Sequence, residues 1–327
     1  MGRRRRNARL AEARGVCGTV DRAFYGRAGA MTGAPGGPRS MTAQALQRAL
    51  PHAQPITLAG GASVAFAQAG SGEPIVLVHG SLCDYRYWQP QFAPLAATHR
   101  VLSLSLGHYF PTRELNDTQP FSWNAHVEQI AAFIDSLVRE PAHVVAHSRG
   151  AYLAFHLARR FPDRLRSVTL ADPGGAVQDG DASGAQEAAG NVNALRARAV
   201  ALIAQGDVDA GLALFVDSVS RPGSWAQSPR EFKAMARDNA HTLRPQVAEQ
   251  MPAFAAHEAA AITVPVLLVG GGKSPSIFHR NIEWLQQRID GARQMTIAGA
   301  SHGMNLAHPH AFNRTVLDFI DAHSVAR

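Results

Sequence analysis

Cysteine is scarce in this sequence. Cys17 and Cys83 are the only two among 327 residues. Two cysteines are too few for a disulfide framework or a cysteine-based zinc site, so we expect a protein of the reducing cytoplasm. The chain also lacks any run of the ~18 uninterrupted apolar residues that a membrane-spanning helix requires. We therefore expect no membrane partner.

Sequence signatures of metal and nucleotide sites are absent as well. The chain has no H-E-x-x-H segment, and "GGGKS" at 270–274 lacks the G-x-x-x-x-G-K spacing of a phosphate-binding loop. From these absences we expect that the protein uses no metal and no other cofactor.

Charged residues are few, at 17%, and their positive excess is confined to one segment. The net charge is +7. Residues 1–40 hold nine arginines against Glu12 and Asp21, which accounts for all of it, and the rest of the chain balances at 23 basic and 23 acidic residues. The body of the protein is therefore neutral, so we expect no nucleic-acid partner.

The basic leader, residues 1–45, has no sustained apolar periodicity. An arginine run can bind nucleic acid or serve as an address. A signal peptide would need an apolar stretch of about 7–15 residues after it, and none follows. We expect either a disordered extension or upstream sequence translated ahead of a start at Met31 or Met41.

Residues 46–327 are expected to form one α/β domain, because short apolar runs alternate with helical stretches. The expected strands are 63–70, 74–80, 100–106, 142–148, 166–173, 264–271 and 293–299. The expected helices between them are 122–139, 149–160, 279–289 and 309–323. This alternation predicts a doubly wound, mostly parallel sheet with helices on both faces.

One interval interrupts the alternation. About ninety residues between Pro173 and Val264 contain no buried-strand run, and their pattern is helical. We expect a helical cap at about 176–260, over the carboxyl edge of the sheet, where open α/β sheets bind ligands. Phe215, Trp225 and Met235 could line a pocket beneath it or form the core of the cap itself.

The segment "HVVAHSRGAYLA" (143–154) predicts a strand, a sharp turn at Ser148 and a helix. A reactive serine on such a turn needs small residues two positions before and after it. Ala146 and Gly150 meet this need, although glycine is usual at both positions. We interpret Ser148 as a candidate nucleophile, while a serine that merely ends a strand remains the alternative.

A serine hydroxyl becomes a good nucleophile only when a base removes its proton. His302, in "MTIAGASHGMNLAHP", follows the last expected strand and therefore lies at the same sheet edge as Ser148. His308 and His310 begin the final helix and are expected at the surface. His147 is expected to point away from Ser148 and to form local contacts.

Backbone N–H groups would have to stabilise the oxyanion that forms during attack. Arg149, directly after the serine, offers one. The loop "HGSL" at 79–82 offers the second, with Ser81 as the candidate donor and Leu82 as the next. Cys83 is interpreted as a small buried residue.

Together these segments resemble the α/β-hydrolase fold superfamily, in particular capped serine esterases. The resemblance covers about 60–323 and rests on four motifs in the family's order: "VLVHGS", "VVAHSRGAYLA", "VPVLLVGGGKSP" and "IAGASHGMNLAHPHAFNRTVLDFI". It implies a cap between the sixth and seventh core strands of the sheet and a catalytic histidine at His302.

The family's usual acid is missing. It would stand on or near Ser274, and no Asp or Glu follows until Glu283. Some members carry the acid after the strand that follows the nucleophile strand, and Asp172 occupies that position, 24 residues after Ser148. Asp172 could instead cap the following turn. If it is the acid, Asp172→Asn should lower turnover severely and Ser274→Ala should not.

The sequence therefore favours a serine hydrolase that cleaves an ester, thioester or lactone of a small-molecule substrate through Ser148, His302 and Asp172. The same three residues could support hydrolysis of a carbon–carbon bond in a ring-cleavage product, or cofactor-free perhydrolase chemistry. A ligand receptor or binding module on the same fold is the non-enzymatic alternative. The pattern leaves the oligomeric state open.

Overall fold

The computed structural model describes residues 50–178 and 182–324, and the side chains of 193 onward in the second range. The predicted extension, 1–45, lies outside the described residues. An eight-stranded sheet has the order β1-β2-β4-β3-β5-β6-β7-β8. The strands are β1 (Gln54–Thr57), β2 (Ser63–Ala69), β3 (Pro74–Val78), β4 (Arg100–Ser105), β5 (Ala142–His147), β6 (Leu165–Ala171), β7 (Val266–Gly271) and β8 (Arg293–Ile297).

The sheet is mostly parallel, as the alternation of strands and helices predicts. Only the β1–β2 and β2–β4 pairs are antiparallel. Strands β3, β5 and β7 are buried along their whole length. Helices on both faces of a parallel sheet exclude water from it, which explains why β3 and β7 carry no polar side chain and why β5 is apolar apart from its two buried histidines.

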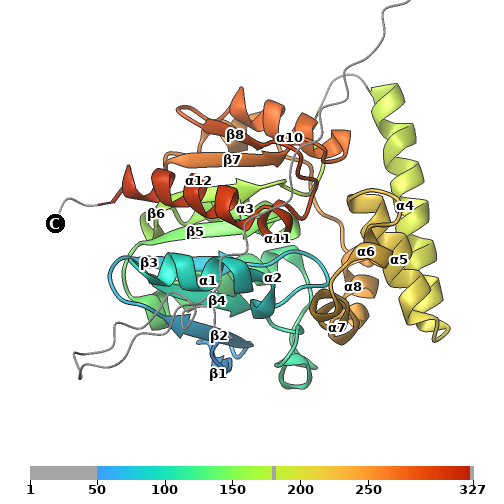
Figure 1. Ribbon diagram of the computed structural model, residues 1–327, viewed down its shortest axis with the longest axis horizontal. Coiled ribbons are helices and arrows are strands. Elements are labelled where there is room, and N and C mark those ends of the chain that lie inside the picture. The colour runs from blue at the N-terminus through green and yellow to red at the C-terminus, as the bar shows by residue number, and fades with distance from the viewer. Residues whose placement is uncertain (1–49, 179–181, 325–327) are drawn as a thin grey trace, which may run out of the picture. The chain divides into compact units, whose positions relative to one another are not determined.

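Helices cover both faces of this sheet, and each face has its own apolar core. Side chains of α2, α3 and α10 pack on one face and those of α1, α11 and α12 on the other. Figure 1 shows α1 and α12 together in front of the strands. These helices are α1 (Gln89–Ala96), α2 (Trp123–Phe133), α3 (Arg149–Arg160), α10 (Ser276–Gln286), α11 (Met304–Ala307) and α12 (Pro309–Asp321).

Short helical turns connect several of these elements. They are η1 (Tyr85–Trp88), η2 (Arg113–Asn116), η4 (Pro162–Arg164), η5 (Ala240–Thr242) and the π-helical turn η3 (Ile134–Val138). The η3 turn continues α2, so the predicted helix 122–139 is one helical segment whose last turn is wider. It ends at Arg139, whose φ is 61°.

Strand β1 and helix α1 were not predicted from the sequence pattern. Strand β1 is short and largely exposed, so it carries no apolar run. Helix α1 contains Pro94 and has Pro90 in its first turn. Proline in the first turn fits a helix, but an interior proline removes a hydrogen bond and normally argues against one. Here Phe92 and Leu95 are buried in the core, and this tertiary packing stabilises α1.

A helical insertion, defined here as α4–α9, separates β6 from β7. Its helices are α4 (Ala182–Ala204), α5 (Val208–Val219), α6 (Ser224–Gln227), α7 (Arg230–Asp238), α8 (Leu243–Ala248) and α9 (Ala256–Ala260). Figure 1 shows α4–α8 gathered beyond one end of the strands, the end from which β5 leads into α3. Within the described residues, no helix is long and apolar enough to cross a membrane.

Candidate active site

Ser148 lies on a sharp turn between β5 and α3. Its φ of 56° and ψ of −119° are unusual for a residue with a side chain. The turn brings α3 very close to the loop after β3: a Cβ added to Gly150 would lie 2.4 Å from the carbonyl oxygen of His79. Gly150 is therefore required by the close approach of two backbones, whereas Ala146 is accommodated inside the core.

Ser148, His302 and Asp172 form a continuous chain of hydrogen bonds. Ser148 Oγ lies 3.0 Å from Nε2 of His302, and Nδ1 of His302 lies 3.1 Å from Oδ2 of Asp172. Asp172 follows β6 and His302 follows β8, so the carboxyl ends of three parallel strands bring the residues together. Asp172 is fully buried and His302 nearly so.

Ser274 extends this chain by one member. Its hydroxyl donates to Oδ2 of Asp172 at 2.5 Å, the same oxygen that faces His302. The other carboxylate oxygen, Oδ1, accepts a longer bond from the backbone N–H of Gly271 at 3.4 Å. Sequence reasoning treated Ser274 only as the position where an acid is missing. In the structure, Ser274 follows β7 and its hydroxyl contacts the carboxylate of Asp172, which follows the neighbouring strand β6.

Two rings hold His302 in place. Phe278 stacks on its imidazole, with ring centroids 4.1 Å apart and an interplanar angle of 15°. Behind it, Nε2–H of His147 donates to the backbone carbonyl of His302 at 2.7 Å. Burial lowers the pKa of His147 well below its usual value, so the ring stays neutral. His147 was expected to form local contacts, but its Nε2–H instead reaches the His302 loop, 155 residues away, and fixes it.

The loop after β3 is also rigidly held. Nδ1–H of His79 donates to the carbonyl of Gly80 at 2.9 Å, and Nε2 accepts from Leu106 N–H at 3.2 Å. Burial lowers the pKa of His79 to about 4, which keeps this neutral tautomer at neutral pH. The Ser81 hydroxyl donates to Oε1 of Gln246 in the insertion at 2.6 Å.

Two cavities meet at Ser148. The larger has a volume of about 410 Å³ and is lined by residues that include Ser81, Cys83 and His302. The smaller, of about 70 Å³, is lined by Ser81, Ser148 and Arg149 among others. Ser148 therefore lines both cavities, so that a substrate could place one part in each.

Of the three residues proposed to line a pocket, only Phe215 does so, and it contacts both cavities. Trp225 belongs to the apolar core of the insertion. Met235 packs with the core cluster on the α1 and α12 face. His308 and His310 are exposed, as expected for the start of α12, although His308 lies at the wall of the larger cavity.

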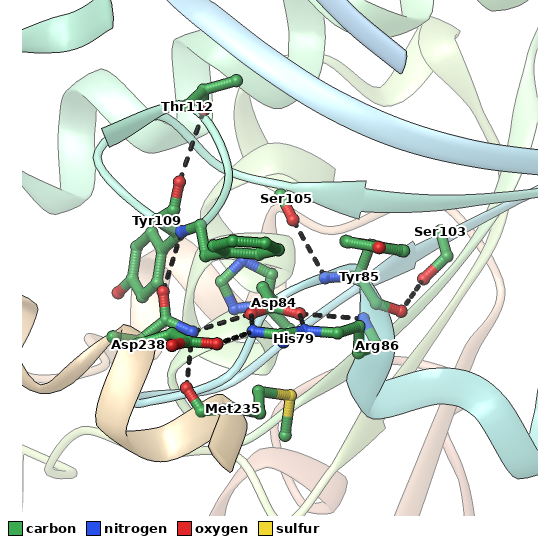
Figure 2. A network of polar contacts seen from close by, with 12 residues as sticks. His79, Asp84, Tyr85, Arg86, Ser103, Ser105, Tyr109, Thr112, Met235 and Asp238 are labelled. Atoms are coloured by element: carbon green, nitrogen blue, oxygen red, sulfur yellow. Dashed lines mark hydrogen bonds and ion pairs between the residues drawn. The ribbon is translucent and has the colours of Figure 1, made fainter. Parts of the chain in front are cut away.

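A buried carboxylate fastens the insertion to the loop after β3. Asp84 accepts hydrogen bonds from the Arg86 guanidinium at 2.6 and 2.9 Å and from the side-chain amide of Asn239 at 2.8 Å. Arg86 also donates to Asp238, at the end of α7, at 2.8 Å. Figure 2 shows Asp84 hydrogen-bonded to Arg86, with Asp238 and Met235 of the insertion beside them.

Removing that carboxylate should destabilise the protein strongly. In Asp84→Ala, the Arg86 and Asn239 donors would lose a buried partner, so we expect the free energy of unfolding to fall by about 3–5 kcal/mol. Urea unfolding followed by circular dichroism measures this. The matched control is Asp135→Ala, which breaks an exposed pair with Arg164 and should cost at most about 1 kcal/mol. Equal losses in the two variants would contradict the role given to Asp84.

Comparison with known proteins identifies the family of this chain. The family model described as the alpha/beta hydrolase family matches residues 75–315. The chain belongs to that family. The match includes β3, the Ser148 turn, Asp172 and the His302 loop, so the whole hydrogen-bonded chain lies within it. Membership makes this protein a hydrolase, and it confirms the fold that the motifs predict.

Individual relatives of this hydrolase are distant. A pimeloyl-[acyl-carrier protein] methyl ester esterase of Neisseria meningitidis serogroup C is 28% identical over 76% of this chain and 93% of its own length. A thermophilic esterase from Thermogutta terrifontis superposes with a TM-score of 0.65 at 19% identity, covering 84% of this chain and all of that one. An enol-lactonase from Burkholderia xenovorans superposes with a TM-score of 0.65 at 21% sequence identity, covering 82% of this chain and 100% of that one.

Side chains that could together bind a metal ion are not grouped in the described part of the chain. Among residues 50–178 and 182–324, no three side chains of His, Cys, Asp or Glu are grouped so that they could hold a metal ion. Burial raises the pKa of the Cys83 thiol well above its usual value, which suits a small buried residue.

Proposed function

We propose that this hydrolase cleaves carboxylic esters, thioesters or lactones through an acyl-enzyme formed on Ser148. The observation that carries the proposal is the unbroken hydrogen-bond chain from Ser148 through His302 to Asp172, together with two cavities that both reach the serine. The resemblance to esterases such as the Neisseria methyl ester esterase supports this bond type.

In the first step, Ser148 Oγ attacks the carbonyl carbon while Nε2 of His302 accepts its proton. Asp172 Oδ2 accepts the hydrogen bond from Nδ1–H and stabilises the imidazolium that forms. The tetrahedral oxyanion accepts hydrogen bonds from the backbone N–H groups of Ser81 and Arg149. Arg149 is the first residue of α3, so the partial positive charge of the helix N-terminus adds to this stabilisation.

The intermediate then collapses. The imidazolium of His302 gives its proton to the leaving alcohol or thiol, and the acyl group remains bonded to Ser148 Oγ. Water enters, loses a proton to Nε2 and attacks the acyl carbon. A second collapse returns that proton to Ser148 and releases the carboxylic acid.

A substrate panel tests the bond type. The wild-type protein should release nitrophenolate from p-nitrophenyl acetate and butyrate, because Ser148 attacks activated acyl groups regardless of their natural alcohol. The comparison reactions are hydrolysis of a meta-cleavage ring product and formation of a peracid. Turnover of the ring product with none of the nitrophenyl esters would contradict esterase chemistry and favour carbon–carbon hydrolysis.

A further inference from the structure

The small cavity beside Ser148 is lined by more positive than negative side chains. Its wall includes two guanidinium groups, Arg149 and Arg196, and a single carboxylate, Glu249. Arg149 and Glu249 form a buried ion pair, with Nη2 to Oε1 at 2.8 Å and Nε to Oε1 at 3.1 Å. Both side chains of this pair are almost completely enclosed, at 5% and 6% exposure. The pair uses the whole negative charge of the cavity.

Glu249 has no capacity left for Arg196. Its Oε2 accepts the backbone N–H of Trp123 at 2.7 Å and a further bond from Arg149 at 3.1 Å. Even so, Nη1 of Arg149 is buried without a hydrogen-bond partner. The guanidinium donors in this cavity therefore exceed what its one described carboxylate accepts.

Arg196, on α4, is the second guanidinium of this cavity, and its side chain is partly buried. Its Nε is buried without a hydrogen-bond partner, and no carboxylate in the described part of the chain forms an ion pair with it. Burial lowers the pKa of this guanidinium from its ordinary value. A buried polar group without a partner costs free energy, and the Nε of this partly buried guanidinium is such a group. A carboxylate that enters the cavity would supply both the missing acceptor and the opposite charge.

We propose that this cavity binds a carboxylate carried by the acyl half of the substrate, with Arg196 as its principal partner. The inference rests on the proposed function, because it places the reacting carbonyl at Ser148. The cavity of about 70 Å³ is the smaller of the two and suits a short chain, whereas the cavity of about 410 Å³, which also reaches Ser148, gives the alcohol room to leave. The substrate class is a monoester of a short dicarboxylic acid.

The first measurement compares monomethyl succinate with methyl butanoate, which lacks the second carboxylate. Wild-type kcat/KM, followed by proton release in a pH-stat, should favour the succinate ester. Arg196→Met keeps the apolar stem and removes the charge. The preference ratio should fall about 10- to 100-fold in this variant, the value of a hydrogen bond to a charged group.

A second measurement is independent of turnover. In the Ser148→Ala background, calorimetry should detect succinate binding but not butanoate binding, and adding Arg196→Met should remove the succinate heat. Succinate binding without any ester hydrolysis in the wild type would leave the anion site standing and overturn the proposed function. Ester hydrolysis without succinate preference or binding would overturn the anion site alone.

Two further variants separate charge from folding. Arg198→Met removes an exposed arginine from the same helix and should keep the wild-type preference. Arg196→Lys retains a positive charge and should keep part of it, which makes the test valid even if Arg196→Met folds poorly. Loss of preference in Arg198→Met equal to that in Arg196→Met would contradict a specific role for Arg196.

Discussion

Ser148→Ala should abolish hydrolysis of p-nitrophenyl acetate and butyrate. The substitution deletes Oγ, which lies 3.0 Å from His302 Nε2, so no atom remains to form the acyl-enzyme. We expect kcat to fall about 10⁶-fold, as when the nucleophile of such a hydrogen-bonded set is removed. The backbone donors and the cavities persist, so substrate binding should survive and the loss should appear in kcat and not in KM.

Active-site labelling provides the direct readout for Ser148. A fluorophosphonate probe should label the wild-type protein and leave Ser148→Ala unlabelled. Ser301→Ala is the matched control, because it removes a hydroxyl from the wall of the same cavity without touching the hydrogen-bond chain, and it should still be labelled. Undiminished labelling of Ser148→Ala would show that another residue is the nucleophile.

The second large effect is expected at Asp172. Asp172→Asn keeps the shape of the side chain but removes its charge and one of its two acceptors. Oδ2 serves His302 and Ser274 at once, so an amide nitrogen at that position would face two donors. His302 would then hold the wrong tautomer or lose the stabilisation of its imidazolium. We expect kcat to fall about 10⁴-fold, as for the equivalent change in a Ser-His-Asp set.

Ser274 supplies the graded comparison for this experiment. Ser274→Ala removes one hydrogen bond to the carboxylate and leaves its charge, so we expect a loss of about tenfold in kcat. Ser274→Thr keeps the hydroxyl and should restore part of the rate. A larger loss in Ser274→Ala than in Asp172→Asn would show that the acid was assigned to the wrong strand.

The elements that the sequence predicted well are those whose signal is local. A strand that is buried on both faces consists mostly of consecutive apolar residues, and runs of this kind mark β3, β5 and β7. Helix α3 begins and ends where its pattern predicts, at Arg149 and Arg160. By contrast, β1 is too short and exposed to carry a pattern, and α1 contains a proline that only its core packing overcomes.

The functional site also has a part that the sequence predicts and a part that it does not. The sequence determined that Ser148, Asp172 and His302 each follow a parallel strand, and strands of one direction present their carboxyl ends at one edge of the sheet. Chain order alone therefore brought these three residues to a common edge. It could not supply their distances, because these depend on the register of β5, β6 and β8 within the sheet.

Tertiary structure alone decided what surrounds them. Ser274 gains a contact with Asp172 from a neighbouring strand, and Glu249 reaches Arg149 from the far end of the insertion, 100 residues away. Arg196 comes to the cavity from α4, an alanine-rich helix whose own sequence does not mark this residue as functional. Partners so distant along the chain leave no local periodicity, because burial and charge pairing depend on how separate elements pack in space.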